Sequence, residues 1–388
     1  MTSLHRETWL DSLRTSIAEI TPAEALARQA AGALLIDVRE DGERASGTPP
    51  GALGLSRGFL ELRIEQIEAD RERDIVTLCG SGQRSLLAAE ALQRLGYRRV
   101  SSVAGGYNRW KAEGLPVALG ALDADAAERY SRQLRLPQVG EAGQARLGQA
   151  RIALLGAGGL GAPAALYLAA AGVGQLTLID DDVVDRSNLH RQVIHADARV
   201  GMSKAESARI ALAALNPRVQ VEVRNERLQA DNVERLLGGH DLVIDGADNF
   251  PARYLVAAAS QRLRLPMIYG AVERFTGQVS VFDPRRADSP CYRCLFPEPP
   301  SAAEAPNCSE AGVLGVLPGI VGLLQATEAL KLVLDIGEPL VGRLLGFDAL
   351  AMRFRETRLP RDPACPGCGA QAEFRGYEDI QQLCAAAG

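Results

Sequence analysis

The sequence lacks an uninterrupted apolar run of the ~18–20 residues that a membrane-spanning helix needs. Residues 1–20 carry scattered charges and no apolar core, so we expect no secretion signal. An excess of basic charge is also missing: 43 Lys and Arg stand against 48 Asp and Glu, a net charge of −5. Nucleic acid is therefore not expected as a partner. These features predict a cytoplasmic protein that binds no membrane and no nucleic acid.

An even set of cysteines is absent as well. The chain has seven, and four of them form two Cys-x-x-Cys pairs, Cys291 with Cys294 and Cys365 with Cys368. Without a secretion signal, this pattern favours metal or redox chemistry over structural disulfides. Four thiolates make a closed structural zinc site, which would tie the C-terminal segment to the middle of its domain. Two redox disulfides are the alternative, but neither pair opens a helix in a thioredoxin-like context.

At 388 residues, the chain is too long for one ordinary domain. Residues 1–118 alternate helix and strand signals, which predicts a small α/β domain with a parallel sheet. Residues 119–126, LGALDADA, are small and aperiodic and are expected to form a linker. A second α/β domain, with a mainly parallel sheet, is expected over residues 127–388.

A cysteine lies at the start of a glycine-rich loop in the first domain. The segment CGSGQRS, Cys79 to Ser85, follows a predicted buried strand and precedes a helix. Backbone N–H groups in such a loop point at one spot and favour a negatively charged sulfur, and Arg84 would favour it further. We therefore expect Cys79 to be a nucleophile that carries a persulfide. The alternative is a buried core cysteine.

The first domain resembles the rhodanese family of sulfurtransferases. The matching segments are Asp37-Val38-Arg39, Pro50-Gly51-Ala52, the Cys79 loop and Gly105-Gly106-Tyr107. The loop length fits the sulfur-carrying branch rather than the phosphatase relatives. Two positions depart from the family: Thr48-Pro49 stands where His-Ile is frequent, and Gly80 stands where many members have arginine. The resemblance implies a rhodanese-like fold with a persulfide-bearing Cys79.

A second glycine-rich turn, GAGGLG, joins a predicted strand at 151–155 to a helix, and the next strand ends in Asp180-Asp181-Asp182. Such glycines allow a tight turn, the helix N-terminus faces a phosphate, and the acid binds a ribose hydroxyl. The pattern predicts a Rossmann-like nucleotide site. By itself it does not choose between NAD, FAD, S-adenosylmethionine and ATP.

Charged residues after this turn favour ATP. Arg191 and Lys204 are two cations that hydride transfer does not need, whereas substitution at a triphosphate does, because charge builds on the leaving pyrophosphate. Asp248-Asn249 follows another predicted strand, where a carboxylate suits Mg²⁺ bridging phosphates. Each charge alone could equally be an exposed surface pair. An NAD(P)-dependent oxidoreductase with an accessory sulfurtransferase domain, or a non-catalytic scaffold for a ubiquitin-like partner, remain alternatives.

Together, these motifs resemble the MoeB/ThiF/HesA family, bacterial relatives of ubiquitin-activating enzymes. The resemblance runs over residues 129–369 and rests on RYSRQ, GAGGLG, SNLHRQ, VGMSK, DGADN, GAVERFTGQV, PCYRC and CPGCG. It implies an ATP-dependent adenylyltransferase that acts, with Mg²⁺, on the C-terminal Gly-Gly carboxylate of a ubiquitin-fold sulfur carrier. The residues implied to bind or activate ATP are Gly156, Gly158, Gly159, Gly161, Asp180, Ser187, Asn188, Leu189, His190, Arg191, Lys204, Asp248 and Asn249. Arg132 is implied to reach the phosphates of the other subunit of a homodimer. His190 departs from the family, where glutamine is common.

A carboxylate of this kind needs no general base, because its reference pKa of ~3.3–3.7 leaves it ionised at neutral pH. Arg191, Lys204 and Asp248 would instead neutralise ATP and stabilise the leaving pyrophosphate. Cys308 lies in a Pro-, Ala- and Gly-rich stretch, 297–318, expected to form a long mobile loop. In the family, this cysteine can form a thioester or acyl disulfide, and a passive role is the alternative.

The two domains together predict conversion of the carrier's C-terminus into a thiocarboxylate. Sulfur would come from the Cys79 persulfide, loaded by a donor such as a cysteine desulfurase. The small subunit of molybdopterin synthase is the carrier we expect. Thiamine synthesis and tRNA thiolation are the alternative pathways.

Overall fold

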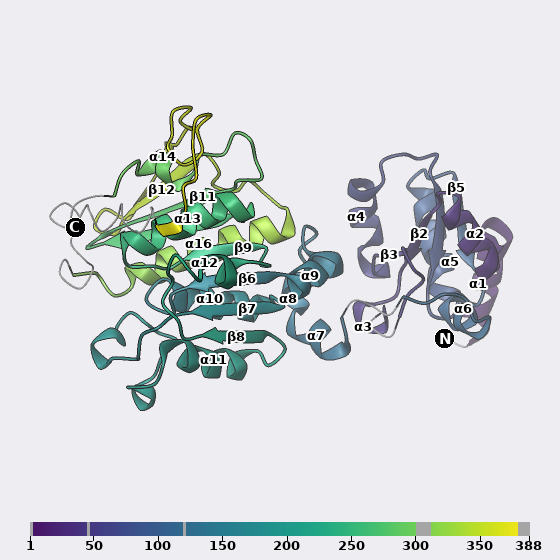
Figure 1. Ribbon diagram of the computed structural model, residues 1–388. Coiled ribbons are helices and arrows are strands. Elements are labelled where there is room, and N and C mark those ends of the chain that lie inside the picture. The colour runs from purple at the N-terminus through teal and green to yellow at the C-terminus, as the bar shows by residue number, and fades with distance from the viewer. Residues whose placement is uncertain (1–2, 45–46, 119–121, 300–311, 379–388) are drawn as a thin grey trace. The chain divides into compact units, whose positions relative to one another are not determined.

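The computed structural model describes residues 3–44, 47–118, 122–299 and 312–378 (Figure 1). The chain divides into two compact units, Met1–Arg135 and Leu136–Gly388. Two short helices, α7 (Ala124–Arg129) and α8 (Ser131–Leu134), belong to the end of the first unit. The predicted domain boundaries at residues 118 and 127 therefore lie inside the first compact unit, and these boundaries stay a prediction.

The first unit is built on a five-stranded sheet in the order β1-β5-β4-β2-β3, and all of its pairs are parallel. Its strands are β1 (Ala18–Ile20), β2 (Leu34–Asp37), β3 (Leu53–Gly54), β4 (Asp74–Leu78) and β5 (Arg99–Val103). Its helices are α1 (Ser3–Ser16), α2 (Pro22–Ala30), α3 (Asp41–Arg44), α4 (Leu60–Ile67), α5 (Gln83–Arg94) and α6 (Gly106–Ala112). Two buried apolar clusters pack in this unit, one around Ile36, Ile75 and Leu86 and one around Leu35, Val76 and Trp110. The predicted parallel α/β domain is confirmed.

The second unit is built on an eight-stranded sheet in the order β13-β12-β11-β10-β9-β6-β7-β8 (Figure 1). Its parallel part comprises β6 (Arg151–Leu155), β7 (Gln175–Ile179), β8 (Gln220–Arg224), β9 (Leu242–Asp245) and β10 (Met267–Glu273). An antiparallel meander of β11 (Thr276–Phe282), β12 (Arg343–Asp348) and β13 (Arg353–Arg358) extends it beyond β10. The sequence predicts strands at 151–155, 175–180, 219–224, 242–245 and 266–269, and the structure has a strand at each of these places. No pattern in the sequence predicted the three antiparallel strands.

The second unit also contains α-helices. They are α9 (Gly140–Gln149), α10 (Gly161–Ala171), α11 (Lys204–Leu215), α12 (Val233–Leu237), α13 (Phe250–Leu263), α14 (Tyr292–Leu295) and α16 (Leu317–Leu334). Within the described part of the chain, α16 is long and apolar enough to cross a membrane by those measures alone, and half of it is buried in the protein. It packs on α10, β10 and β11. Its buried Gln325 donates hydrogen bonds to the carbonyls of Asp245 (2.7 Å) and Ile268 (3.1 Å), so α16 is a core helix.

Candidate functional site

A cavity of about 760 Å³ opens at the carboxyl ends of β6, β7 and β9. In the sheet, β7 lies on one side of β6 and β9 lies on the other, so the strand order reverses its direction at β6. This is the topological switch point, where ligands of open α/β sheets bind. Of the residues predicted for the nucleotide, the cavity is lined by Gly156, Gly158, Gly159, Asp180, Arg191, Lys204, Asp248 and Asn249. Segments far apart in the sequence therefore meet at one site.

The glycines of the turn have separate physical roles. Gly156 has a φ of +85°, and a Cβ there would lie 2.9 Å from the carbonyl oxygen of Gly246. At Gly161, a Cβ would lie 1.9 Å from the carbonyl oxygen of Gly156, so only glycine lets α10 start this close to the turn. Gly161 does not line the cavity. Its role is to allow close packing of α10 against the turn.

Asp180 follows β7 and fixes the turn through its carboxylate. Its Oδ2 accepts the N–H of Ala157 at 2.7 Å, and its Oδ1 accepts the N–H of Asp182 at 2.9 Å. Burial raises the pKa of Asp180, while the two backbone donors lower it. Each oxygen keeps a further lone pair, so a ribose hydroxyl could still bind there.

The two predicted cations are held by different partners. Lys204 begins α11, and its Nζ donates to Oδ2 of Asp182 at 2.8 Å. The lysine side chain is 8% exposed, against 64% for the aspartate, so the ammonium lies inward of its counter-ion. Arg191 donates from Nη2 to Oδ1 of Asn188 at 2.7 Å. Asn188 therefore orients the guanidinium rather than lining the cavity itself.

The neighbours of Asn188 also lie outside the cavity lining. Ser187 donates from Oγ to Asp185 (2.5 Å) within a short 3-10 turn. Nδ1 of His190 lies 2.9 Å from the carbonyl oxygen of Ser187. These residues, with Leu189, shape the segment that carries Arg191. Their predicted contact with ATP stays a prediction.

Asp248 and Asn249 lie where β9 leads into α13. Asp248 is exposed to solvent at the cavity. Asn249 caps α13 by accepting the N–H of Ala252 at 3.0 Å, and its Nδ2 donates to Oδ1 of Asp248 at 3.2 Å. The cap thus fixes where the Asp248 carboxylate points. An exposed carboxylate that lines the cavity is a suitable Mg²⁺ ligand.

Sequence reasoning missed several cavity residues, among them Asp182, Gln192 and Arg253. Arg253 donates from Nη2 to the carbonyl of Ala247 at 2.7 Å, and its Nε lies 3.4 Å from Oδ2 of Asp245. Burial raises the pKa of Asp245 to about 6, although the arginine lowers it. The signal for Arg253 was its place four residues after Asn249, one helical turn along the same face.

Cys79 lies fully buried at the end of β4 in the first unit. Its Sγ accepts the N–H of Gly82 at 3.2 Å, and its carbonyl accepts the N–H of Tyr107 at 2.7 Å. Gly106, at φ +58°, packs so closely that a Cβ would lie 2.2 Å from the Cys79 carbonyl oxygen. The Gly-Gly-Tyr segment therefore packs against the backbone of the cysteine loop and stabilises it.

The predicted cation beside this cysteine is paired. Arg84 makes a bidentate contact to Glu43, from Nη1 to Oε2 at 2.7 Å and from Nη2 to Oε1 at 2.6 Å. The hydrogen bonds hold the pKa of Glu43 at about 2. Thr48 has a structural part here too, because its Oγ1 donates to Oδ2 of the buried Asp37 at 2.8 Å.

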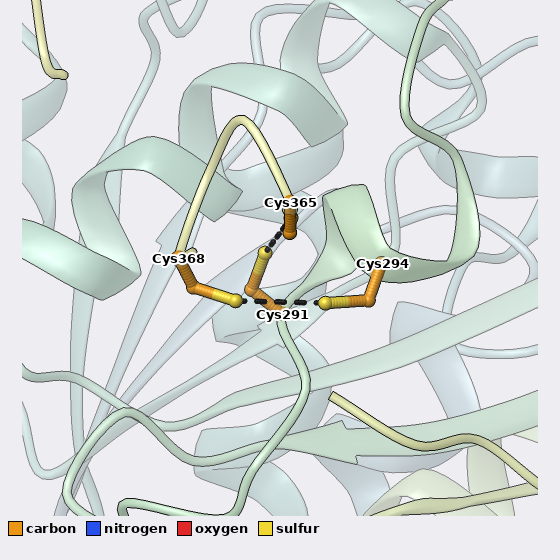
Figure 2. A group of neighbouring side chains, drawn as sticks. All are labelled: Cys291, Cys294, Cys365 and Cys368. Atoms are coloured by element: carbon orange, nitrogen blue, oxygen red, sulfur yellow. Dashed lines mark hydrogen bonds between the residues drawn. The ribbon is translucent and has the colours of Figure 1, made fainter. Parts of the chain in front are cut away.

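Four cysteines gather between α14 and the C-terminal segment (Figure 2). They are Cys291, Cys294, Cys365 and Cys368, and their sulfur atoms all lie within 4.8 Å of one another. The close pairs join the two motifs: Cys291 to Cys365 at 3.6 Å and Cys294 to Cys368 at 3.5 Å. Disulfides measure about 2.05 Å, whereas four ligands at the Zn–S length of about 2.3 Å in a tetrahedron lie ~3.8 Å apart. The donor set therefore fits one thiolate-bound metal ion, and all four cysteines are free rather than joined in disulfides.

Two further predicted site residues are Arg132 and Cys308. Arg132 is exposed on α8, which belongs to the first compact unit. Cys308 lies outside the described residues. Their roles stay predictions.

Both parts of the chain match known protein families. Residues 130–367 match the ThiF family, and residues 21–113 match the rhodanese-like domain. "SAMP-activating enzyme E1" of Haloferax volcanii is 51% identical over 68% of this chain and 96% of its own length. "Sulfur carrier protein adenylyltransferase" of Thermus thermophilus is 49% identical over 66% and 96%.

Two further similarities concern domain content and fold. "Probable adenylyltransferase/sulfurtransferase MoeZ" of Mycobacterium tuberculosis is 48% identical over 68% of this chain and 66% of its own length. Among solved structures, E. coli MccB with ATP superposes with a TM-score of 0.54, covering 62% of this chain and 74% of that one. At 22% identity, this last similarity concerns the fold alone.

Proposed function

The chain belongs to the ThiF family, and from that premise we propose that it adenylates the C-terminal glycine of a ubiquitin-fold sulfur carrier and then transfers sulfur to it. The observation that carries the proposal is the cavity that brings the glycine-rich turn, Asp180, Arg191, Lys204 and Asp248 together. The relatives' names, sulfur carrier protein adenylyltransferase and adenylyltransferase/sulfurtransferase, support it. The same findings favour adenylation over the oxidoreductase alternative.

The adenylation step is a substitution at phosphorus. A carboxylate oxygen of the carrier attacks the α-phosphorus of ATP, and the bond to the bridging oxygen breaks, so that pyrophosphate leaves with the electron pair. The glycine-rich turn and the N-terminus of α10 face the phosphates, and Arg191 and Lys204 stabilise charge on the leaving group. Asp248, which lines the cavity, would hold a Mg²⁺ ion, and the ion would supply positive charge for the phosphates.

Sulfur transfer completes the reaction. The terminal sulfur of a Cys79 persulfide attacks the acyl carbon of the adenylate, AMP leaves, and an acyl disulfide forms. A thiolate must then attack the Cys79 sulfur, so that the thiocarboxylate departs with its electron pair and a disulfide remains. Cys308 is one candidate for that thiol, and a small external thiol is the other. The thiol that enters is oxidised, so each turnover needs a reductant of the thiol class.

We also propose the finer assignments that the sequence suggested. The carrier would be the small subunit of molybdopterin synthase, with thiamine synthesis or tRNA thiolation as alternatives. A cysteine desulfurase would load Cys79, and the enzyme would act as a cytoplasmic homodimer. The direct test is carrier-dependent ATP–pyrophosphate exchange, with a carrier lacking its last glycine as the control. Absence of exchange, together with NAD(P)H-dependent hydride transfer, would reverse the assignment.

The four-cysteine cluster leads to a prediction about metal content. We expect the purified protein to hold about one zinc per chain, because the four sulfur atoms fit a single tetrahedral ion. A chelator should then make the C-terminal segment protease-sensitive before the rest of the chain. Elemental analysis and limited proteolysis measure both, with Cys79→Ala as a control that leaves the zinc unchanged. A metal-free protein with a disulfide between Cys291 and Cys294 would contradict the assignment.

The pair between Glu43 and Arg84 leads to a prediction about the Cys79 loop. With the pKa of Glu43 at about 2, the carboxylate stays ionised near neutral pH and shares the charge of Arg84. Glu43→Gln should free that charge for an anionic donor and lower KM for thiosulfate by roughly three- to tenfold. Glu61→Gln breaks a separate surface pair, with Arg57, and should leave KM unchanged. An unchanged KM in Glu43→Gln, or a fall in both variants, would contradict the prediction.

A further inference from the structure

One buried histidine in the second unit has no part in the chemistry above. Along the chain, His195 lies between Arg191 and α11, and its side chain is buried, with the residue only 8% exposed. Its Nε2 lies 3.0 Å from the carbonyl oxygen of Ala157, and its Nδ1 lies 2.9 Å from Oγ of Ser207. A carbonyl only accepts, so Nε2 carries the proton, and Nδ1 accepts the Ser207 hydroxyl. Burial lowers the pKa of His195 to about 4, so this neutral tautomer persists at physiological pH.

Ala157, the second residue of the GAGGLG turn, is held on both sides. Its N–H donates to Oδ2 of Asp180 at 2.7 Å, and its carbonyl accepts from His195. These two bonds fix the orientation of the peptide planes on either side of Ala157. The peptide that follows leads directly into Gly158, which lines the cavity. The direction in which the turn presents its N–H groups therefore depends on both side chains.

His195 also contacts residues 187–192, which include Arg191 and are called the Arg191 segment. The N–H of His195 donates to the carbonyl of Gln192 at 3.1 Å, directly after Arg191. Through its ring and its backbone, His195 joins the glycine-rich turn to the Arg191 segment. A rigid link of this kind preorganises charge around a leaving group, which is worth more than a contact that forms during the reaction.

We propose that His195 is a positioning residue for adenylation, which holds the glycine-rich turn and the Arg191 segment in the geometry that receives the ATP phosphates. The proposal rests on the proposed function of this cavity. It assigns His195 no contact with the substrate, because the histidine does not line the cavity.

The chain contains a matched control. His240 is also partly buried, and its ring makes the same two kinds of bond, from Nδ1 to the carbonyl oxygen of Leu237 at 3.0 Å and from Nε2 to Oγ1 of Thr177 at 2.8 Å. It lies before β9, at the opposite end of that strand from the cavity, and does not line it. A buried histidine with a purely structural part would behave alike at both positions.

The test compares His195→Phe, His195→Gln and His240→Phe in the full-length protein. A glutamine amide places a donor near the position of Nε2, so His195→Gln should restore the bond to Ala157. We expect His195→Phe to raise KM for ATP in pyrophosphate exchange by about tenfold and to lower kcat. His195→Gln should stay within about threefold of wild type, and His240→Phe should keep KM while losing thermal stability. Thiosulfate:cyanide sulfurtransfer by Cys79 should be unchanged in all three.

Other results would overturn the proposal. Equal changes in KM for His195→Phe and His240→Phe would reduce His195 to a structural residue, and so would a wild-type KM in a folded His195→Phe. If His195→Phe does not fold, a tenfold loss of ATP affinity in His195→Gln contradicts the expected rescue. Binding of a non-hydrolysable ATP analogue, measured by calorimetry, tests the position of the turn without any carrier. A wild-type protein that binds the analogue but exchanges no pyrophosphate would refute the proposed function instead.

Discussion

A Cys79→Ala variant is expected to keep carrier-dependent ATP–pyrophosphate exchange within about twofold of wild type and to lose sulfurtransfer and thiocarboxylate formation. Adenylation uses a carboxylate that already exists, whereas sulfur delivery requires the persulfide. Asp248→Ala is expected to do the opposite. Exchange should fall by at least about a hundredfold, because the variant lacks the carboxylate that would hold Mg²⁺ at the phosphates. Thiosulfate:cyanide sulfurtransfer should remain in that variant, since Asp248 and Cys79 belong to different compact units.

Two conservative variants act as controls for this separation. Cys79→Ser keeps the size of the buried side chain and should match Cys79→Ala. Asp248→Asn keeps the hydrogen bond from Asn249 but removes the charge, and it should lose exchange as Asp248→Ala does. Cys308→Ala should keep exchange and reduce thiocarboxylate formation if that thiol releases the product. Loss of exchange in a folded Cys79→Ala as complete as in Asp248→Ala would show that the two half-reactions are not separate.

The parallel strands of both units could be predicted because their signals are local. β6, β7 and β9 are short, mainly apolar runs, each with a glycine or aspartate at its end or directly after it. Parallel strands of this kind are buried on both faces. The antiparallel strands carry no such signal. All six residues of β13, RFRETR, are exposed, so no buried face leaves an alternation in the sequence. The start of α16 could not be predicted for another reason. Leu317 and Pro318 fall at the end of the Pro-, Ala- and Gly-rich stretch 297–318, whose composition predicts a loop.

The candidate site could be predicted where a motif names the residue and could not where the fold alone supplies it. Asp180, Arg191, Lys204 and Asp248 follow predicted strands or turns, and the structure places all four at the cavity. His195 meets the turn at the carbonyl of Ala157, a contact between residues 38 apart in sequence that the tertiary fold creates. Neither spacing nor residue type announces that contact. For the same reason, the division of Asn188 and Arg191 into orienting and lining residues needed the structure.

Arg132 and Lys204 provide the strongest test of a shared site. In the proposed homodimer, Arg132 of one subunit reaches the phosphates bound by the other, while Lys204 acts within its own subunit. Arg132→Ala and Lys204→Ala homodimers should therefore each be inactive in exchange, with losses of at least about a hundredfold. After subunit exchange in an equal mixture, half of the dimers carry one variant of each kind. Each such dimer has one site with both cations and one site with neither.

Mixing the two inactive variants should thus restore roughly a quarter of wild-type exchange, since one site in two is intact in half of the dimers. The matched control is a mixture of Lys204→Ala with Asp248→Ala, because both residues line the same cavity of one chain and every site in that mixture lacks one of them. Activity should return in the first mixture alone. Absence of rescue, with subunit exchange verified by tagged chains, would mean that Arg132 acts within its own subunit or not at all. Rescue in the control mixture would place Lys204 and Asp248 in different active sites and contradict the cavity as the site of adenylation.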